Sequence, residues 1–487
     1  MKQSNQRVIR NPLLSRGIGP HLVLLISLGL PLFLLALLGI ASRTTGSLAA
    51  IWPANALLLG LMIRSDRYNT ALGWLTACAA LTLADVVTGA PLLKTVLLTA
   101  GNLIGVAGGV LVAKHIPDRH YCPQQTHGMP GMLLVILAAS LSAGYVGMVA
   151  YPALIGGSFW EGWLYWCVTE LVNYIAFLPV VLTAPLIELK PLKHWHVRRG
   201  SITPLSLLPG LSVVALCVAG IFIDGPAALT IPVIALLWCS FSYSIFTTAL
   251  LTLFFCIWTL MALSLGYLSL GTNLSGWNHL MSWRTGVSVI ALVPIIVASY
   301  NLNRLRQLQH LQWAASHDTL TGAWNRGAFY EHLQTAAGSS SSRPLALLMM
   351  DLDHFKTIND QYGHTAGDKA LRHFCDVVQH CIRDTDVLGR MGGEEFAVLL
   401  TDCPEDELAI IAERIRFTLK INPITLTDQS LVTICFSAGG ALTNATEVDP
   451  DRLLEQADTA LYKAKRNGRD RLVQYREADS PMNIAQS

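Results

Sequence analysis

The chain has 487 residues, of which 52% are hydrophobic and 14% charged, whereas globular domains carry about 25% charged residues. Residues 1–306 hold 17 Lys+Arg and 7 Asp+Glu (net +10), and residues 307–487 hold 17 and 25 (net −8), which together give the overall +2. This composition excludes a secreted, disordered or wholly cytosolic protein, and the acidic second part argues against nucleic acid as a partner.

Ten apolar stretches in the first 300 residues are long enough to cross a lipid bilayer as helices. They lie near residues 21–41, 46–63, 70–88, 92–113, 130–152, 162–187, 202–223, 226–245, 247–268 and 282–300. The division between 226 and 268 is the least defined, because no charged residue interrupts it. We therefore expect a cytoplasmic tail over residues 1–20 and a membrane domain over 21–300 with eight to ten spans.

Lysine and arginine are distributed unevenly over the segments that join these stretches. With ten spans and an internal N-terminus, 14 of them lie on the inner side, and Arg43, Lys94 and Arg284 lie on the outer side. Cytoplasmic segments of membrane proteins are enriched in such positive charge. The pattern predicts an even number of spans, with both termini and the C-terminal half in the cytoplasm.

A few polar residues interrupt the apolar stretches. Asp85 and Glu170 are ionisable, and Asn55 accompanies them. A carboxyl group at membrane depth is costly, so it marks a functional site or a structural hydrogen bond between helices, and the sequence does not separate the two. In the run IWPANA at residues 51–56, proline within a span would leave a backbone carbonyl open to a neighbour or a ligand.

These features resemble the membrane-associated sensor domains of the MASE type over about residues 20–300. The resemblance implies that the membrane half senses a signal, which the sequence does not identify. Asn55, Asp85 and Glu170 are the candidate sensor residues. Transport of a ligand by the same half remains an alternative.

Residues 301–316 are expected to continue the last membrane helix as a linker. Leu302, Leu305, Leu308 and Leu311 recur every three residues, a spacing that drifts around a helix and forms no heptad seam. A long dimeric coiled coil is therefore not expected. A short paired helix remains open, and it would connect the membrane half to the C-terminal half.

Residues 317–476 alternate between helix and strand patterns, which predicts one α/β domain. Helices are expected after residue 326 and over 366–382, 405–421 and 450–466. Strands are expected over 345–350, on both sides of Gly392 and Gly393, and near 431–440 and 471–475. A glycine pair between two strands is typical of a two-residue β-hairpin. Residues 477–487 are expected to be a disordered tail.

Acidic residues follow two of these strands. Asp351 and Asp353 end one strand, and Glu394 and Glu395 follow the hairpin turn. If the strands are neighbours, carboxylates from both converge on one edge of the sheet, where hard oxygen ligands suit magnesium and substrate phosphates. For the hairpin alone, the alternative is an ordinary turn with solvated acids.

Several motifs at fixed spacing surround these acids. They are DTLTG at 318–322, NR at 325–326, MDLDHFKTIND at 350–360, GH at 363–364, GD at 367–368 and GGEEF at 392–396. Over about residues 316–476 they resemble the GGDEF family of diguanylate cyclases, whose signature tolerates Glu at its third place. The resemblance implies a palm-type nucleotidyl-cyclase fold with a mostly antiparallel sheet, and condensation of two GTP to cyclic di-GMP with release of two pyrophosphates.

The resemblance also implies roles for single residues. Asp351, Glu394 and the Leu352 carbonyl match the ligands of two divalent ions, Mg²⁺ or Mn²⁺, and Glu394 would also accept the proton of the 3′-hydroxyl. The residues matched to substrate contacts are Asn359 and Asp368 for guanine, His364 beside the nucleotide, Lys356 for transition-state charge, and Lys465 and Arg469 for the outer phosphates.

Two further expectations follow from the resemblance. Each domain would hold one GTP, so catalysis would need a homodimer. Arg383 and Asp386 form an RxxD that begins nine residues before Gly392, which matches an inhibitory product site where cyclic di-GMP would bind, with Arg414 as a further contact. The alternative is a catalytically silent receptor for GTP or cyclic di-GMP, but the matched catalytic and guanine-reading residues are all present.

Overall fold

The computed structural model describes residues 19–43, 49–117, 120–125, 128–185, 203–223, 225–268, 277–339, 344–426, 429–443 and 448–476. Its contacts divide the chain into two compact units, Met1–Arg306 and Gln307–Ser487. The predicted disordered tail and nearly all of the predicted N-terminal tail lie outside the described residues, as do several basic inner segments.

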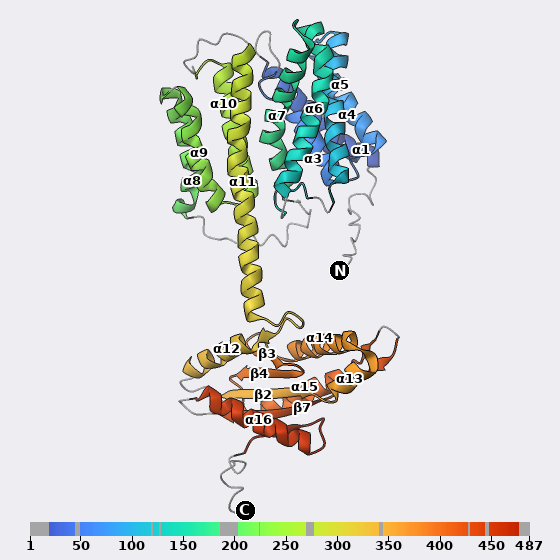
Figure 1. Cartoon of the computed structure of the whole chain (residues 1–487), viewed down its shortest axis with the longest axis vertical. Coiled ribbons are helices and arrows are strands. Elements are labelled where there is room, and N and C mark those ends of the chain that lie inside the picture. The colour runs from blue at the N-terminus through green and yellow to red at the C-terminus, as the bar shows by residue number, and fades with distance from the viewer. Residues whose placement is uncertain are drawn as a thin grey trace, which may run out of the picture. The chain divides into compact units, whose positions relative to one another are not determined.

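The first unit consists of apolar helices (Figure 1). They are α1 (Pro20–Leu24), which continues through a π-helical turn (Leu25–Gly29) into α2 (Leu30–Ala41), α3 (Pro53–Arg64), α4 (Ala71–Val87), α5 (Leu92–His115), α6 (Gly128–Leu154), α7 (Phe159–Thr183), α8 (Pro204–Ile223), α9 (Gly225–Ser242), α10 (Ile245–Ser264) and α11 (Trp277–Ser316). Within the described residues, eight helical stretches are long and apolar enough to cross a membrane, and α3 and α4 are shorter. Each of the ten predicted stretches overlaps one of these helices.

Two local details differ from the sequence expectations or sharpen them. Pro53 is the first residue of α3. At this position of a helix the backbone N–H has no intrahelical hydrogen-bond acceptor, so the N–H that proline lacks is not needed. The expectation that this proline frees a backbone carbonyl inside a span is therefore wrong. The undefined division between 226 and 268 falls at Ser244, whose side chain caps α10 by accepting a hydrogen bond from the Thr247 N–H.

Helices α6 and α7 approach each other closely enough to require glycine. A Cβ on Gly162 would lie 2.4 Å from the Gly147 carbonyl oxygen, and one on Gly147 would lie 2.7 Å from the Gly162 carbonyl oxygen. Small residues that allow backbones to touch are typical of helix pairs in membranes. This contact fixes the N-terminal part of α7, which carries Glu170.

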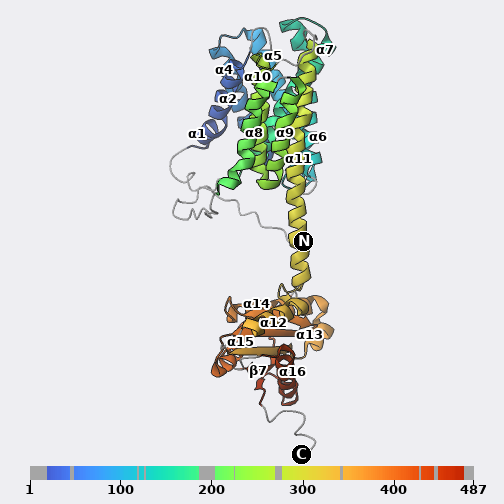
Figure 2. The ribbon, with the colours of Figure 1, turned by 90° about the vertical axis from the view of Figure 1, so that its left-hand side faces the viewer.

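The second unit is a six-stranded sheet between two layers of helices (Figures 1 and 2). Its strands are β1 (Trp324–Asn325), β2 (Leu345–Leu352), β3 (Val387–Gly392), β4 (Glu395–Thr401), β7 (Phe436–Thr443) and β8 (Leu472–Gln474), in the order β1-β3-β4-β2-β7-β8. Its helices are α12 (Arg326–Ser339), α13 (Phe355–Tyr362), α14 (His364–Cys381), α15 (Glu405–Ile421) and α16 (Pro450–Arg466).

The central strand β2 shows why both faces need helices. All eight of its residues are buried, and their side chains alternate between the two faces, as in any strand. Ala346, Leu348 and Met350 join the core under α13, α14 and α15. Leu345, Leu347 and Met349 join the core under α12 and α16. The sheet is thus buried on both sides, and its functional groups are confined to its ends.

The prediction of a mostly antiparallel sheet is wrong, because the sheet is mixed. β3, β4, β2 and β7 pair antiparallel, but β1 with β3 and β7 with β8 pair parallel. Helix α16 connects β7 to β8, and such a helical crossover returns the chain in the same direction. The predicted strand near 431–440 is also wrong in extent, because β6 (Leu431–Val432) pairs with β5 (Ile424–Thr425) in a separate small sheet.

Candidate active site

The end of β2 and the turn between β3 and β4 lie next to each other. In the sheet register Asp351 pairs with Glu395, and the Leu352 N–H donates to the Glu394 carbonyl oxygen at 3.3 Å. The turn consists of Gly393 and Glu394, because Gly392 pairs with Glu395. This is one residue later than the glycine pair predicts, since a bulge shifts the register after Arg390. Asp351, Leu352 and Glu394 are therefore adjacent.

A single arginine holds this turn in place. The Arg390 guanidinium donates to the Gly393 carbonyl oxygen at 2.6 and 3.0 Å and to Asp318 Oδ1 at 2.8 Å. Burial would raise the pKa of Asp318, but hydrogen bonds from Thr321 and Arg390 hold it below its ordinary value. The sequence presented DTLTG and GGEEF as separate motifs, and Arg390 joins them. Its role was not predicted.

Negative charge is concentrated around the end of β2. Burial, and then the neighbouring Asp351 carboxylate, raise the pKa of Glu395, and Glu394 adds to the effect. Lys465 opposes it, with its Nζ 2.7 Å from Asp351 Oδ2. The acidic residues Asp351, Glu394 and Glu395 thus have one cationic neighbour, the ammonium group of Lys465.

These donors fit a divalent cation that shares its coordination with substrate. Two carboxylates, of Asp351 and Glu394, and the Leu352 carbonyl are hard oxygen ligands of the kind that Mg²⁺ prefers. The ammonium group of Lys465 lies beside Asp351, which indicates that a positive charge is favourable at this position. Among the described residues no group of three or more His, Cys, Asp or Glu side chains could hold a metal alone, so phosphate or water oxygens would have to complete the shell.

Asp353, the second acid at the strand end, has a different role. Its Oδ1 accepts from Ser437 Oγ at 2.7 Å, and its Oδ2 accepts from the Asp470 N–H at 2.9 Å. Arg469 Nε lies 3.9 Å from Oδ1. The side chain is 3% exposed, so its oxygens are occupied by the protein. Asp353 positions the turn that presents Arg469, a role that the sequence analysis missed.

That turn has an unusual backbone. Gly468, Arg469 and Asp470 have φ values of 108°, 61° and 44°, in the left-handed region that non-glycine residues rarely adopt. Such strain persists where surrounding contacts fix it, and Asp353 supplies one of these contacts. The basic pair Lys465 and Arg469 is thereby placed beside Asp351 and Asp353, respectively.

The two residues matched to guanine recognition lie on neighbouring helices. Asn359 is in α13 and Asp368 is in α14, and the helices are joined at Gly363, which has a φ of 81°. A Cβ on Gly367 would lie 2.0 Å from Asn359 Oδ1, so the amide of Asn359 rests against the backbone of α14. The Asp368 side chain is 48% exposed, which leaves it accessible to a ligand.

Lys356 and His364 are exposed in the first turns of α13 and α14, respectively. His354 precedes α13 with a φ of 56° and accepts hydrogen bonds from the Thr357 and Ile358 N–H groups through its carbonyl. The β2–α13 connection is therefore a tight turn next to the acids. Helix α13 itself was not predicted, although all the residues that it positions were named.

The RxxD pair lies at the start of β3, at the other end of that strand from the GGEEF turn. The Arg383 guanidinium forms an ion pair with Glu407. Asp386 is 7% exposed, accepts from the Arg383 N–H at 2.9 Å, and has a pKa raised by burial. The Arg414 guanidinium donates to the Cys381 carbonyl. In this structure all three side chains are engaged with the protein itself.

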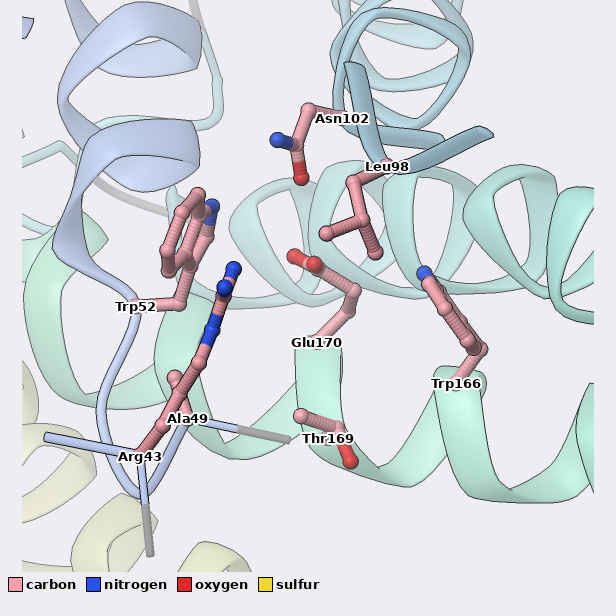
Figure 3. A pocket seen from close by; sticks show the side chains of 8 residues that line it. All are labelled: Arg43, Ala49, Trp52, Leu98, Asn102, Trp166, Thr169 and Glu170. Carbon is pink, nitrogen blue, oxygen red and sulfur yellow. The ribbon is translucent and has the colours of Figure 1, made fainter. Parts of the chain in front are cut away.

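Of the candidate sensor residues, two meet and one does not. The Asn55 amide donates to Glu170 Oε1 and to Asn102 Oδ1, both at 2.9 Å. Asp85 instead lies 3.6 Å from the Arg43 guanidinium. Glu170, Asn102 and Arg43 line the same pocket, shown in Figure 3. Asp85 is thus connected to the pocket through Arg43.

Comparison with known proteins agrees with this geometry. The family model described as "Diguanylate cyclase, GGDEF domain" matches residues 315–471. The probable diguanylate cyclase DgcF of Escherichia coli O157:H7 is 26% identical over 443 residues, covering 89% of this chain and 91% of that protein. DgcF of Escherichia coli K12 is 32% identical over 271 residues, covering 54% of this chain and 85% of that protein.

A solved structure of the GGDEF domain of PA1120 (TpbB or YfiN) from Pseudomonas aeruginosa is 35% identical, with a TM-score of 0.33, and covers 35% of this chain and 99% of that one. The E. coli K12 relative shares identity well beyond the residues of the motifs, and the family model covers the α/β domain up to the residue before β8. The chain belongs to the GGDEF family of diguanylate cyclases.

Proposed function

We propose that this diguanylate cyclase is embedded in the bacterial inner membrane and condenses two GTP to cyclic di-GMP under the control of its membrane half. The observation that carries the catalytic part is the adjacency of Asp351, Leu352 and Glu394, with Lys465 beside them. The eight long apolar helical stretches support the membrane location.

The metal site would be formed by Asp351, Glu394 and the Leu352 carbonyl. Divalent ions bound there would neutralise phosphate charge and lower the pKa of the attacking hydroxyl. Glu394 is a half-buried residue of the β3–β4 turn, and its carboxylate would accept the 3′-hydroxyl proton. The 3′-oxygen then bonds to the α-phosphorus of the second GTP, and the bond from that phosphorus to pyrophosphate breaks.

The remaining residues bind and orient the substrate. Asp368 would accept from the guanine N1–H and N2–H, and the Asn359 amide beside it would complete a pattern that adenine does not satisfy. Lys465 and Arg469 would hold the outer phosphates, and Lys356 would stabilise charge in the transition state. Lys465 would then exchange its contact with Asp351 for one with phosphate.

Two such half-sites are needed for one product, because each domain would hold one GTP and both 3′-oxygens must react. We therefore propose a homodimer as the active form. Specific activity should rise with protein concentration until dimers dominate. A specific activity that stays constant over a 100-fold dilution, with the protein monomeric by light scattering, would contradict this.

The catalytic proposal is tested with the full-length protein in nanodiscs, supplied with GTP and Mg²⁺, with cyclic di-GMP measured by chromatography. Glu394→Gln should lower turnover by at least about 100-fold, as expected when a group acting directly on the reacting atoms is lost. Glu413→Gln is the control, because Glu413 is an exposed residue of α15 that pairs with Arg416. Undiminished turnover in Glu394→Gln would overturn the proposal.

A further inference from the structure

The first unit contains a small pocket at one end of its helices. Its volume is about 40 Å³, and it is lined by Arg43, Ala49, Trp52, Leu98, Asn102, Trp166, Thr169 and Glu170. These residues come from the segment between α2 and α3 and from the first halves of α5 and α7. Under the predicted topology, this is the outer end of the bundle.

One wall of the pocket has a carboxyl group with an unpaired oxygen. Glu170 is 4% exposed, and its Oε1 accepts from Asn55. Its Oε2 has no hydrogen-bond partner among the described residues. Leaving a buried polar atom unpaired costs about 1–3 kcal/mol, and more for a charged group, so this oxygen is a strong acceptor for a ligand.

The opposite side of the pocket carries a cationic group. The Arg43 guanidinium lies 5.7 Å from the centre of the Trp52 ring and 3.6 Å from Asp85, and its side chain is 17% exposed. Figure 3 shows the Arg43 side chain extending toward the Glu170 carboxylate. The pocket therefore offers an acceptor and a donor of opposite charge, with Leu98 and Trp166 as apolar walls.

We propose that this pocket binds a small free amino acid. Its ammonium group would donate to Glu170 Oε2, and its carboxylate would accept from Arg43. A ligand that carries both charges satisfies both walls without adding net charge to the bundle, which a simple cation or anion does not. At about 10–15 Å³ per water-sized site, the pocket holds roughly three such sites, so glycine and L-alanine fit better than larger amino acids.

The pocket is also connected to the helix that leaves the first unit. Arg284, in α11, is 3% exposed. Its guanidinium donates to Thr169 Oγ1 and, at 3.1 Å, to the Ala49 carbonyl, and both of these residues line the pocket. Helix α11 continues to Ser316. A bound ligand would therefore act on α11 through Arg284, and this regulatory part rests on the proposed cyclase function.

Binding is measured on the full-length protein in nanodiscs by calorimetry and by the shift in melting temperature. The probes are glycine, L-alanine, methylammonium and acetate. Glycine or L-alanine should bind saturably and raise the melting temperature, and methylammonium and acetate should do neither at the same concentration. Absence of binding by both amino acids would overturn the proposal. Equal binding of methylammonium would also overturn it, by showing a simple cation site.

Two variants locate the site. Glu170→Gln preserves the size of the side chain and should weaken glycine binding at least 10-fold, and Arg43→Gln should do the same from the other wall. Glu161→Gln, also in α7 but exposed and able to keep its capping contact, should bind like the wild type. Melting without ligand identifies any variant that fails to fold. Unchanged affinity in folded Glu170→Gln and Arg43→Gln would place glycine elsewhere and overturn the assignment.

The binding measurement separates this proposal from the catalytic one. Glycine binding without any cyclic di-GMP formation would contradict the proposed function and leave the site intact. Cyclic di-GMP formation without amino-acid binding would support the proposed function and overturn the amino-acid site. If both occur, glycine should change the rate of the full-length wild type and not that of Glu170→Gln, and an unchanged wild-type rate would refute the regulatory part.

Discussion

At the scale of single residues, neighbouring acids in this domain have separate functions because their partners differ. Asp351 lies beside Lys465 and the GGEEF turn, and we propose that it shares a cation there. Asp353, two residues later, is saturated by Ser437 and the Asp470 N–H. In sequence the two are equivalent carboxylates at a strand end. Only their hydrogen-bond partners distinguish a ligand from a support.

Gly367→Ala tests how Asn359, one of the two residues proposed to bind guanine, is positioned. The added Cβ would meet Asn359 Oδ1 at 2.0 Å, so the Asn359 amide must move while the fold tolerates the change. We expect KM for GTP to rise at least 10-fold, with a stability change of less than about 1 kcal/mol. Gly338→Ala in α12 is the control, since open space surrounds that helical glycine. Equal kinetics in both variants would contradict the assigned contact.

The RxxD aspartate gives a prediction for pH. Burial raises the pKa of Asp386, so the folded state binds its proton more tightly than the unfolded state, and wild-type stability falls as pH rises from about 4 through the raised pKa. Asp386→Asn removes this loss. Its melting temperature, relative to the wild type, should therefore increase between pH 4 and pH 7.

The exposed neighbour Asp384 provides the control, because Asp384→Asn should show no such trend. Scanning calorimetry at both pH values measures the melting temperatures. For a domain of this size, a change of 1 kcal/mol in the free energy of unfolding shifts the melting temperature by about 2–4 °C. If the RxxD is also the product site, Asp386→Asn should lose inhibition by cyclic di-GMP. A melting difference that is constant with pH would refute the effect of burial.

At the scale of elements, the active site depends on how one hairpin is held. The β3–β4 turn consists of the exposed Gly393 and the half-buried Glu394. Arg390 supplies the attachment by bridging the Gly393 carbonyl and Asp318. The DTLTG turn follows α11 directly in the chain, so the same arginine links the catalytic hairpin to the point where α11 ends.

Arg390→Gln tests this attachment. It removes the ion pair with Asp318 and at least one hydrogen bond to Gly393, so kcat should fall by about 10-fold or more as Glu394 loses its position. The fold should survive, with a loss of about 1–3 kcal/mol for a charged hydrogen bond. Arg452→Gln, which alters an exposed arginine of α16, is the comparison. If Arg390→Gln retains full kcat, the hairpin is held by other contacts.

At the scale of the whole molecule, charge predicts the orientation of the helices. Under the predicted topology, the turn after α6 lies outside and the turn after α3 lies inside. Ile155→Cys, at a residue that is 45% exposed, should react with an impermeant maleimide in intact cells, and Asp66→Cys should react only after permeabilisation. Seven of the ten native cysteines are buried, and the unaltered protein gives the background. The reverse labelling pattern would refute the orientation.

Both halves could be delimited from composition, because apolar residues and acidic residues collect in different parts of the chain. The helix-forming stretches were found for the same reason, since periodicity and length are local properties. The sheet was predicted less well. Its two parallel outer pairs depend on crossover helices and on strands as short as β1, which leave little local signal.

The sequence by itself determined the family, the residues proposed to carry the chemistry and the division into an apolar and an acidic half, because motifs, spacing and composition are readable along the chain. The tertiary structure decided which of these residues meet. It gave Asp351 and Asp353 different partners, joined Arg390 to Asp318, and placed Arg43 and Glu170 in one pocket, two of whose lining residues bind Arg284. Each of these contacts links residues whose partners are set by the packing of elements, which no local pattern records.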